Sequence, residues 1–535
     1  MVAPVYTTDL ADITTAETIT GWSALGGGQS GLSDETDYFI QGNQCVSKSG
    51  FTGSTRGQIF NAGTTNITAG NAVFIWVKQN NRNLMDTVAN GGTQVLIGSG
   101  TNAFDQFYVD GNNSEGSALA GWRTYAVDPT ATPSATTGNP NATTWFGCQW
   151  AILGSGSLKG SPNGIDVIRH GRELRVTNGD SGNGYATFSG ASAFDSDTTR
   201  AWGLITPIQG GYLFHGHFVM GQAGTPVDFR DANKSIIVLD DPFLPSTFNE
   251  MSIVNATSNV EWTNIQIGHL GTTSPTTLNL NTGSFLGEGC RFAGCGITTF
   301  SSGQFCRNTS WENSGQIIHA GAILNGSSIS GYTGAANTSA VLYNVAADPD
   351  GEMNLMMFEM GATATHAIEF GTSSPTDITL RSCEFLGYGG TNNANDSVFH
   401  IKRTTGTVNI NLVGCTTDGS FTYRTDGATV NIIIDPVTTL ITVINAVTKA
   451  PLEGARVLLE AGAGGPLTQG FEIISGLTDV NGQISDSRTL ASNQPVVGRA
   501  RLSSEIGNLF KTGDVVGTIN STNGLTVTVQ LIPDE

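Results

Sequence analysis

Four of the seven cysteines share one local setting, each at the foot of a short strand-like segment. The four segments are Gly289-Cys290-Arg291-Phe292, Phe305-Cys306-Arg307, Ser382-Cys383-Glu384-Phe385 and Val413-Gly414-Cys415. Stretches rich in Gly, Asn, Ser and Thr separate them. A small apolar residue that returns to one inward position on each turn of the chain is typical of a solenoid, in which like side chains stack on like. The pattern therefore predicts a long structural shaft of stacked rungs.

The composition favours strands throughout the 535 residues. Charged residues make up 13% of the chain, against about 25% in a typical globular domain. The surface must then consist largely of Thr, Ser, Asn and Gly, which suit strands and turns and are poor in helix interiors. Because no sustained helical stripe occurs either, we expect an all-β protein.

The charge balance argues against a nucleic-acid partner. The chain has 44 acidic and 24 basic residues, which gives a net charge of −20. Binding to a duplex needs clustered Lys and Arg, and the sequence contains no such cluster. The excess acid would also repel anionic lipid. We expect a solvated acidic surface, with no nucleic-acid partner and no membrane insertion.

The start of the sequence has neither the basic region nor the apolar core of a signal peptide. No apolar run is long enough to span a bilayer. Seven cysteines is an odd number without paired spacing, which suits reduced, buried thiols. We therefore expect the protein to be made and folded in a cytoplasm.

Residues 1–190 predict a β-sandwich, because strand candidates follow one another at short intervals with turn signals between them. Antiparallel strands at this spacing favour a jelly roll. The strand order resembles carbohydrate-binding modules of the jelly-roll type, which implies a lectin-like fold. The matching residues are Trp122, Tyr125 and Asp128, then Phe146, Gly147 and Trp150, then Ile165, Asp166 and Ile168.

Four aromatic residues of this region have two interpretations. Trp122, Tyr125, Trp145 and Trp150 form either a carbohydrate-binding platform or the core of the sandwich. Exposure decides between the two, because a ring that stacks on sugar must lie at the surface.

The middle of the chain predicts the shaft itself. Residues 191–235 form a transition segment, and residues 236–434 contain short strand-like segments, each followed by a polar corner, at a loose period of about 20–30 residues. A right-handed parallel β-helix fits this pattern best. An irregular antiparallel sandwich is the alternative.

Residues 435–535 predict a separate small domain of alternating, β-branched strands. The motif residues are Gly454, Ala455 and Val457, followed by Thr478, Asp479 and Gly482. This pattern resembles the Ig-like sandwiches of the prealbumin and carboxypeptidase-regulatory types. In physical terms, the small side chain of Ala455 lets strands approach closely, and Asn481-Gly482 suits a tight turn. The resemblance implies a fold and no chemistry.

The sequence His215-Gly216-His217 predicts two imidazoles on one face of a strand, because side chains repeat every two residues. Copies of the pair around a threefold axis would offer a transition metal several nitrogen ligands. Ordinary strand histidines are the alternative, which we favour because a metal site needs further ligands within reach.

Three acidic or serine motifs have bland interpretations beside their catalytic ones. The loop from Asp348 to Glu352 offers carboxylates to Ca²⁺ but lacks the remaining ligands of an EF-hand, so a solvated turn is expected. The sequence from Gly179 to Gly182 matches the surroundings of some protease serines and is expected to be a surface turn. Asp240 or Asp241 could pair with another carboxylate for glycoside hydrolysis, but the two point to opposite faces of a strand and cannot pair with each other.

The order of these parts resembles structural proteins of tailed bacteriophages, such as tail fibres, tailspikes and capsid decorations. The Cys-x-Phe rungs and the terminal domain from Gly454 to Gly482 support the resemblance. It implies a non-enzymatic virion protein on the particle surface, assembled in the host bacterial cytoplasm. Its partners would be other virion proteins, further copies of itself in a homotrimer, and host-surface glycans. A tailspike-type glycan depolymerase is the alternative, and the missing leader disfavours a secreted adhesin; no catalytic residue follows from the resemblance.

Overall fold

The protein is described by a computed structural model. It describes residues 2–24, 31–49, 57–61, 63, 67–79, 83, 85–112, 121–152, 163–179, 184–194, 201, 203–239, 243–245, 248–270, 275–435, 437–490, 492–502, 509–521 and 523–534. Strands dominate these residues, and α1 (Phe188–Ala193) is the one α-helix among them. The expected all-β class is thereby confirmed. No helix in the described ranges is long and apolar enough to cross a membrane.

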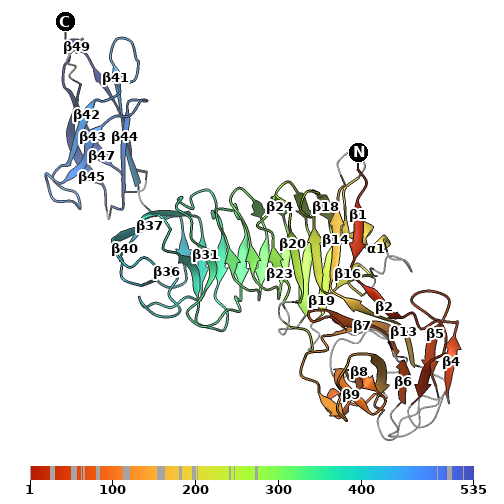
Figure 1. The fold of residues 1–535 in the computed structure, drawn as a ribbon. Coiled ribbons are helices and arrows are strands. Elements are labelled where there is room, and N and C mark those ends of the chain that lie inside the picture. The colour runs from red at the N-terminus through yellow and green to blue at the C-terminus, as the bar shows by residue number, and fades with distance from the viewer. Residues whose placement is uncertain are drawn as a thin grey trace. The chain divides into compact units, whose positions relative to one another are not determined.

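The chain divides into two compact units. The first comprises residues 1–343 and 359–368, and the second comprises residues 344–358 and 369–535. Figure 1 labels the elements of both.

The first unit begins with two antiparallel sheets that pack on a common core. One sheet has the order β10 (Gly121–Val127), β7 (Ala72–Gln79), β13 (Asn163–Gly171), β5 (Cys45–Lys48) and β4 (Leu32–Glu35), with β2 (Ala11–Thr14) also paired to β13. The other has the order β11 (Ala135–Thr137), β9 (Ala103–Asp110), β8 (Thr93–Gly100), β12 (Trp145–Trp150), β6 (Gly57–Asn61) and β3 (Trp22–Ala24). Residues from both sheets, including Ile75, Val95 and Trp150, form one buried cluster.

Parallel ladders follow the sandwich, and in Figure 1 their strands lie side by side along the yellow and green part of the chain. The first ladder contains β14 (Glu173–Thr177), β17 (His217–Met220), β20 (Glu250–Ile253), β23 (Thr277–Asn279), β26 (Thr298–Thr299), β29 (Ile317–Ile318) and β31 (Ser339–Tyr343). The second contains β16 (Gly211–Phe214), β19 (Ser235–Leu239), β22 (Gln266–Leu270), β25 (Arg291–Ala293), β28 (Ser310–Glu312) and β30 (Ser328–Ser330). The third contains β18 (Asp228–Ala232), β21 (Asn259–Thr263), β24 (Ser284–Glu288) and β27 (Phe305–Arg307).

The parallel pairing begins earlier than the boundary expected at residue 236. Strand β14 pairs in parallel with β17, and β16 with β19. Strands β16, β17 and β18 of the segment 191–235 therefore belong to the ladders, and this part of the segment is not a transition between two domains. In addition, β1 (Val5–Thr8) adds to β14 in antiparallel orientation, so both ends of the segment 1–190 belong to this sheet. The alternation of side chains marks these strands in the sequence, but it does not say which neighbour each one pairs with.

The interior of the ladders is filled by stacked rings. Trp262 lies edge-on to Phe285 at 5.3 Å between centroids, and Phe292 lies 5.5 Å from Trp311. At the start of the ladders, Phe188 of α1 packs against Phe218 at 5.0 Å. Aromatic pairs of this kind contribute about 0.5–1.5 kcal/mol each beyond their buried area. The stack therefore fixes the register of successive rungs.

The corners explain why small residues recur beside the strands. Asn264, Gly289 and Asn308 follow β21, β24 and β27, and all three have a positive φ near 50–65°. This left-handed conformation suits Gly and Asn. The residue after Gly289 then turns inward, and the Cys290 Sγ donates to the carbonyl of Trp262 at 3.6 Å. Burial raises the pKa of the Cys290 thiol to about 11, which keeps it protonated.

The predicted placement of the cysteines is confirmed. All seven are free thiols, and all seven are buried. Cys306 has no exposed surface, and Cys383 is 1% exposed.

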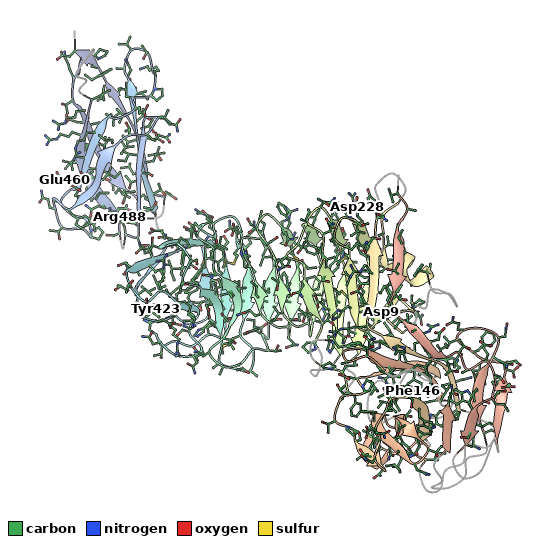
Figure 2. The ribbon with its side chains drawn as sticks, viewed as in Figure 1. Asp9, Phe146, Asp228, Tyr423, Glu460 and Arg488 are labelled. Atoms are coloured by element: carbon green, nitrogen blue, oxygen red, sulfur yellow. The ribbon has the colours of Figure 1, made fainter. Side chains whose placement is uncertain are left out.

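The second unit repeats the parallel pairing on a smaller scale. Its ladders are β34 (Asp377–Arg381), β37 (Thr407–Val413) and β40 (Thr429–Ile434); β35 (Glu384–Leu386) and β38 (Thr416–Thr417); and β36 (Phe399–Ile401) and β39 (Tyr423–Thr425), where Figure 2 labels Tyr423. Strands β32 (Met357–Glu359) and β33 (His366–Phe370) lie where the two units join in sequence. Phe358 and Phe385 stack nearly parallel, at 5.1 Å and 6°.

The second unit ends in a sandwich of two sheets. One has the order β44 (Gln483–Arg488), β41 (Val437–Asn445) and β48 (Leu525–Leu531), and the other β43 (Glu472–Leu477), β42 (Arg456–Ala461), β45 (Gln494–Arg501) and β47 (Gly513–Ile519). Glu460 of β42 and Arg488 of β44 are labelled in Figure 2. Ala455 is fully buried, and its N–H donates to Thr478 Oγ1 at 2.9 Å. The turn residue Gly482 has φ +70°, and its N–H donates to the carbonyl of Asp479.

Candidate functional site: a polar groove on the second unit

A pocket of about 340 Å³ lies on the outer face of the ladder β34, β37 and β40. It is lined by Asp377, Thr379, Arg381, Asn409, Asn411, Val413, Ile433, Thr438 and Ser487. Most of these side chains are polar and point outward, because the alternation along β34 and β37 buries Ile378, Leu380, Ile410 and Leu412 on the other face. We call this pocket the polar groove.

One row of the polar groove is a chain of hydrogen bonds across three rungs. Asp377 pairs in register with Asn409, and Asn409 with Asn431. Asn431 Nδ2 donates to Asn409 Oδ1 at 2.9 Å, and Asn409 Nδ2 donates to Asp377 Oδ1 at 2.8 Å. Each amide thus donates in the same direction, toward the carboxylate. Such a chain polarises its members and fixes their orientation.

The second row of the polar groove has no such chain of hydrogen bonds between the side chains of its described residues. Thr379 pairs in register with Asn411, and Asn411 with Ile433. The side-chain amide of Asn411 makes no hydrogen bond to any described residue. It therefore presents both a donor and an acceptor to the groove. Thr438 and Ser487, whose hydroxyls lie 3.1 Å apart, complete the wall.

The cation of the groove is already paired. Arg381 binds Asp350 through two parallel bonds, with Nε and Nη2 each 2.8 Å from a carboxylate oxygen. These hydrogen bonds lower the pKa of Asp350 and raise that of Arg381. The remaining N–H groups of Arg381 stay available as donors. The loop from Asp348 to Glu352, which was expected to be a solvated turn, is also tied to the next rung, since Asp348 Oδ1 accepts from the N–H of Thr379 at 2.7 Å.

The aromatic residues predicted from the N-terminal region do not form an exposed platform. Tyr125 and Trp150 have no exposed surface, and Trp145 is 4% exposed. The hydroxyl of Tyr125 donates to Asp110 at 2.6 Å, and Trp145 stacks on Phe104 at 5.2 Å. Burial raises the pKa of Tyr125 well above its usual value. These three residues are core, which corrects the interpretation of them as sugar-binding.

Trp122 is the member of that set that is half-buried and not part of the core. Its ring lies 6.3 Å from that of Tyr38, tilted by 59°. Lys78, the register partner of Trp122, places its Nζ over the Tyr38 ring at 2.9 Å from the centroid. One face of Tyr38 is therefore occupied by a cation.

The two predicted metal-binding histidines do not share a strand, because His215 lies in the connection between β16 and β17 and His217 is the first residue of β17. β16 ends at Phe214 and β17 begins at His217, with Gly216 at φ +83° turning the chain between them. His215 is 2% exposed, whereas Arg172 Nε donates to His217 Nε2 at 2.9 Å. Among the described residues, no group of three or more His, Cys, Asp or Glu is placed to hold a metal ion. His215 and His217 therefore do not lie on one face of a shared strand.

Two predicted motifs lie wholly or partly outside the described residues. These are the pair Asp240-Asp241 and, from the protease-like motif, residues 180–182.

The sequence analysis predicted that the residues of the polar groove lie on strands, but it did not predict that they form a site. The segments Asp377-Ile-Thr-Leu and Val408-Asn-Ile-Asn-Leu were recognised as strands by their buried residues. The signal lay in the other half of each segment, where Asp, Thr and Asn occupy every outward position. Reading it required the register between rungs about 30 residues apart.

In comparisons with protein-family models and with curated proteins, no match to this chain was found.

Proposed function

We propose that this chain is a non-enzymatic structural and adhesion protein of a bacteriophage virion, displayed on the particle surface, and that it holds a neutral glycan of the host surface in the polar groove. In this proposal the parallel ladders form a β-helix shaft, the N-terminal sandwich is a jelly roll, and the protein acts as a homo-oligomer with other virion proteins as partners. The observation that supports adhesion is the groove itself.

The chemistry of the groove suits a hydroxyl-rich ligand. The groove is lined by amides, hydroxyls and the guanidinium of Arg381, two of whose nitrogens already bond Asp350. It therefore offers alternating donors and acceptors on a fixed spacing. The rungs stand about 4.8 Å apart, close to the length of one sugar ring. Preoriented groups of this kind lose little entropy when a ligand replaces their water.

The charges favour a neutral glycan over an acidic one. Asp377 is negative, and the one lining cation, Arg381, is neutralised by Asp350. The net charge of −20 adds a general repulsion toward polyanions. An acidic capsule is thus the less suitable ligand.

The same inventory supports binding without cleavage. Glycoside hydrolysis uses two carboxyl groups, about 5–9.5 Å apart, on either side of the scissile bond. Among the described residues that line the groove, Asp377 is the one carboxylate. Its Oδ1 is held by Asn409, which ties it to the ladder. A glycan depolymerase at this groove would lack its second acid.

The test combines binding and cleavage on the same samples. The purified chain is incubated with neutral O-antigen polysaccharides and with acidic capsular polysaccharides, and both retained glycan and newly formed reducing ends are measured over time. We expect binding to a neutral polysaccharide with no release of fragments. Failure to bind any polysaccharide would contradict adhesion, and fragment release would favour the depolymerase.

A matched pair of variants places the binding at the groove. Asn411→Leu keeps the number and branching of the side-chain heavy atoms and removes both hydrogen-bonding atoms, so affinity should fall by about five- to tenfold. Thr407→Ala changes an exposed residue on the same strand that does not line the groove, and affinity should stay unchanged. Equal affinities of the two variants would move the site elsewhere.

A further inference from the structure

Cys383 and Cys415 occupy the same position in successive rungs. Arg381 pairs in register with Val413, and Glu384 pairs with Thr416, so the residues between them are also in register. The N–H of Thr416 donates to the carbonyl of Cys383 at 2.9 Å. The two cysteines therefore lie one strand spacing apart, on the same inward side of the ladder.

That spacing suits a covalent bond. Neighbouring strands are about 4.8 Å apart, and disulfides join residues whose Cα atoms are about 4.4–6.8 Å apart. We propose that Cys383 and Cys415 form an oxidation site, at which a disulfide closes between two rungs of the second unit. This inference is independent of glycan binding.

The hydrogen bonds of the two thiols define the movement that the reaction needs. Cys383 Sγ donates to the carbonyl of Met353 at 3.1 Å, and Cys415 Sγ to that of Leu380 at 3.4 Å, so each thiol points toward the preceding rung. Cys415 therefore points toward the rung of Cys383, and the Cys383 side chain must turn from Met353 toward Cys415. Once turned, the Cys383 thiol can donate to Cys415, and this hydrogen bond lowers the pKa of Cys415, so Cys415 is the nucleophile of the pair.

Access is best at Cys415. It is 8% exposed, whereas Cys383 is 1% exposed. The strand that follows Cys415, β38, is the last of its sheet among the described residues, so no further strand of that sheet pairs with it. An oxidant can reach the outer thiol first, and the inner thiol then completes the bond.

No other cysteine faces a cysteine across the described ladders. Cys306 pairs with Gly287 in register. Cys290 and Cys295 likewise have no cysteine opposite them in register. Ser314 stands opposite Cys295, with its Oγ 3.2 Å from the Cys295 nitrogen. These positions serve as internal controls.

The reaction balances with a diazene oxidant such as diamide. The Cys415 thiolate adds to one nitrogen of the N=N bond, and the Cys383 sulfur then displaces that nitrogen from Cys415. The S–S bond forms, the two thiol protons end on the two nitrogens, and the diazene is reduced to a hydrazine by two electrons.

The experiment uses the full chain. It is treated with diamide, and in parallel with copper–phenanthroline in air. Each sample is then unfolded in denaturant that contains an alkylating agent, digested and analysed by mass spectrometry. We expect a linked peptide pair that contains unalkylated Cys383 and Cys415, present also in Cys295→Ser and absent from Cys383→Ser and Cys415→Ser. Oxidation should raise the melting temperature of wild type and of Cys295→Ser alone.

Alkylation of both Cys383 and Cys415 after both oxidants would overturn the proposal. So would a disulfide that joins either residue to another cysteine or to a second chain.

Discussion

The inward position of Cys306 predicts a large and pH-dependent effect of one substitution. Cys306 has no exposed surface, and its Sγ lies 3.6 Å from Thr309 Oγ1. In Cys306→Asp, a carboxyl group of similar size would replace the thiol at the same place. The neutral acid costs about 1–3 kcal/mol because its hydrogen bonds are incompletely met. The ionised form costs far more, since burial shifts a carboxyl pKa upward by about 3–5 units.

The size of the effect follows from that shift. Each unit corresponds to about 1.36 kcal/mol, so ionisation adds about 4–7 kcal/mol of destabilisation. The sign follows from linkage: the folded variant holds its proton to higher pH than the unfolded chain, so its stability falls as pH rises above about 4. The loss is complete once pH passes the raised folded pKa.

Hydrogen exchange read by mass spectrometry is the suitable assay, because a chain with two compact units need not unfold in one step. Peptides that cover β24, β27 and β28 should lose protection in Cys306→Asp, more at neutral than at acidic pH. Leu286→Asp is the control, since Leu286 lies on the neighbouring strand and is 36% exposed; its effect should stay within about 0.5 kcal/mol. Equal protection of wild type and Cys306→Asp across the pH range would refute the inward placement.

Two further predictions concern the sandwiches. Asp166 is buried, and its pKa in the folded protein is raised to about 7, chiefly by desolvation. Wild type should therefore lose up to about 4 kcal/mol of stability as pH rises from about 4 to about 7. A pH series of melting curves should show this slope in wild type and not in Asp166→Asn. In the C-terminal sandwich, Thr478 Oγ1 accepts from the N–H of Ala455 and donates to the carbonyl of Leu452 at 2.6 Å. Thr478→Val should therefore lower the free energy of unfolding, measured by chemical denaturation, by about 2–4 kcal/mol. Thr438→Val removes a more exposed hydroxyl and is the control; equal losses in the two variants would contradict the reasoning.

The fold class could be predicted because it depends on local rules. Low charge, many Thr and Asn, and the inward return of Cys290 and Cys306 all restrict the chain to stacked strands. The boundary at residue 236 was wrong because it depends on pairing: β14 and β17 are 40 residues apart, and nothing local in either strand records the other. The same limit applies to the aromatic residues of the sandwich. Trp122 and Trp150 look alike in sequence, and only the packing of the two sheets on each other buries Trp150 and leaves Trp122 partly exposed.

The groove and the cysteine pair show where pairing information matters most for function. In each rung the inward residues are chosen by packing, so they repeat and can be recognised one segment at a time. The outward residues are free of that constraint, and they acquire meaning only when rungs are aligned. Asp377, Asn409 and Asn431 form a directed hydrogen-bond chain for this reason, although each is an ordinary polar residue in its own segment. Cys383 and Cys415 likewise become a pair through register, while Cys295 and Ser314, in an equivalent arrangement, do not. In a chain of this kind, chemistry should therefore be sought in columns that run across the rungs, and motifs along the sequence will miss it.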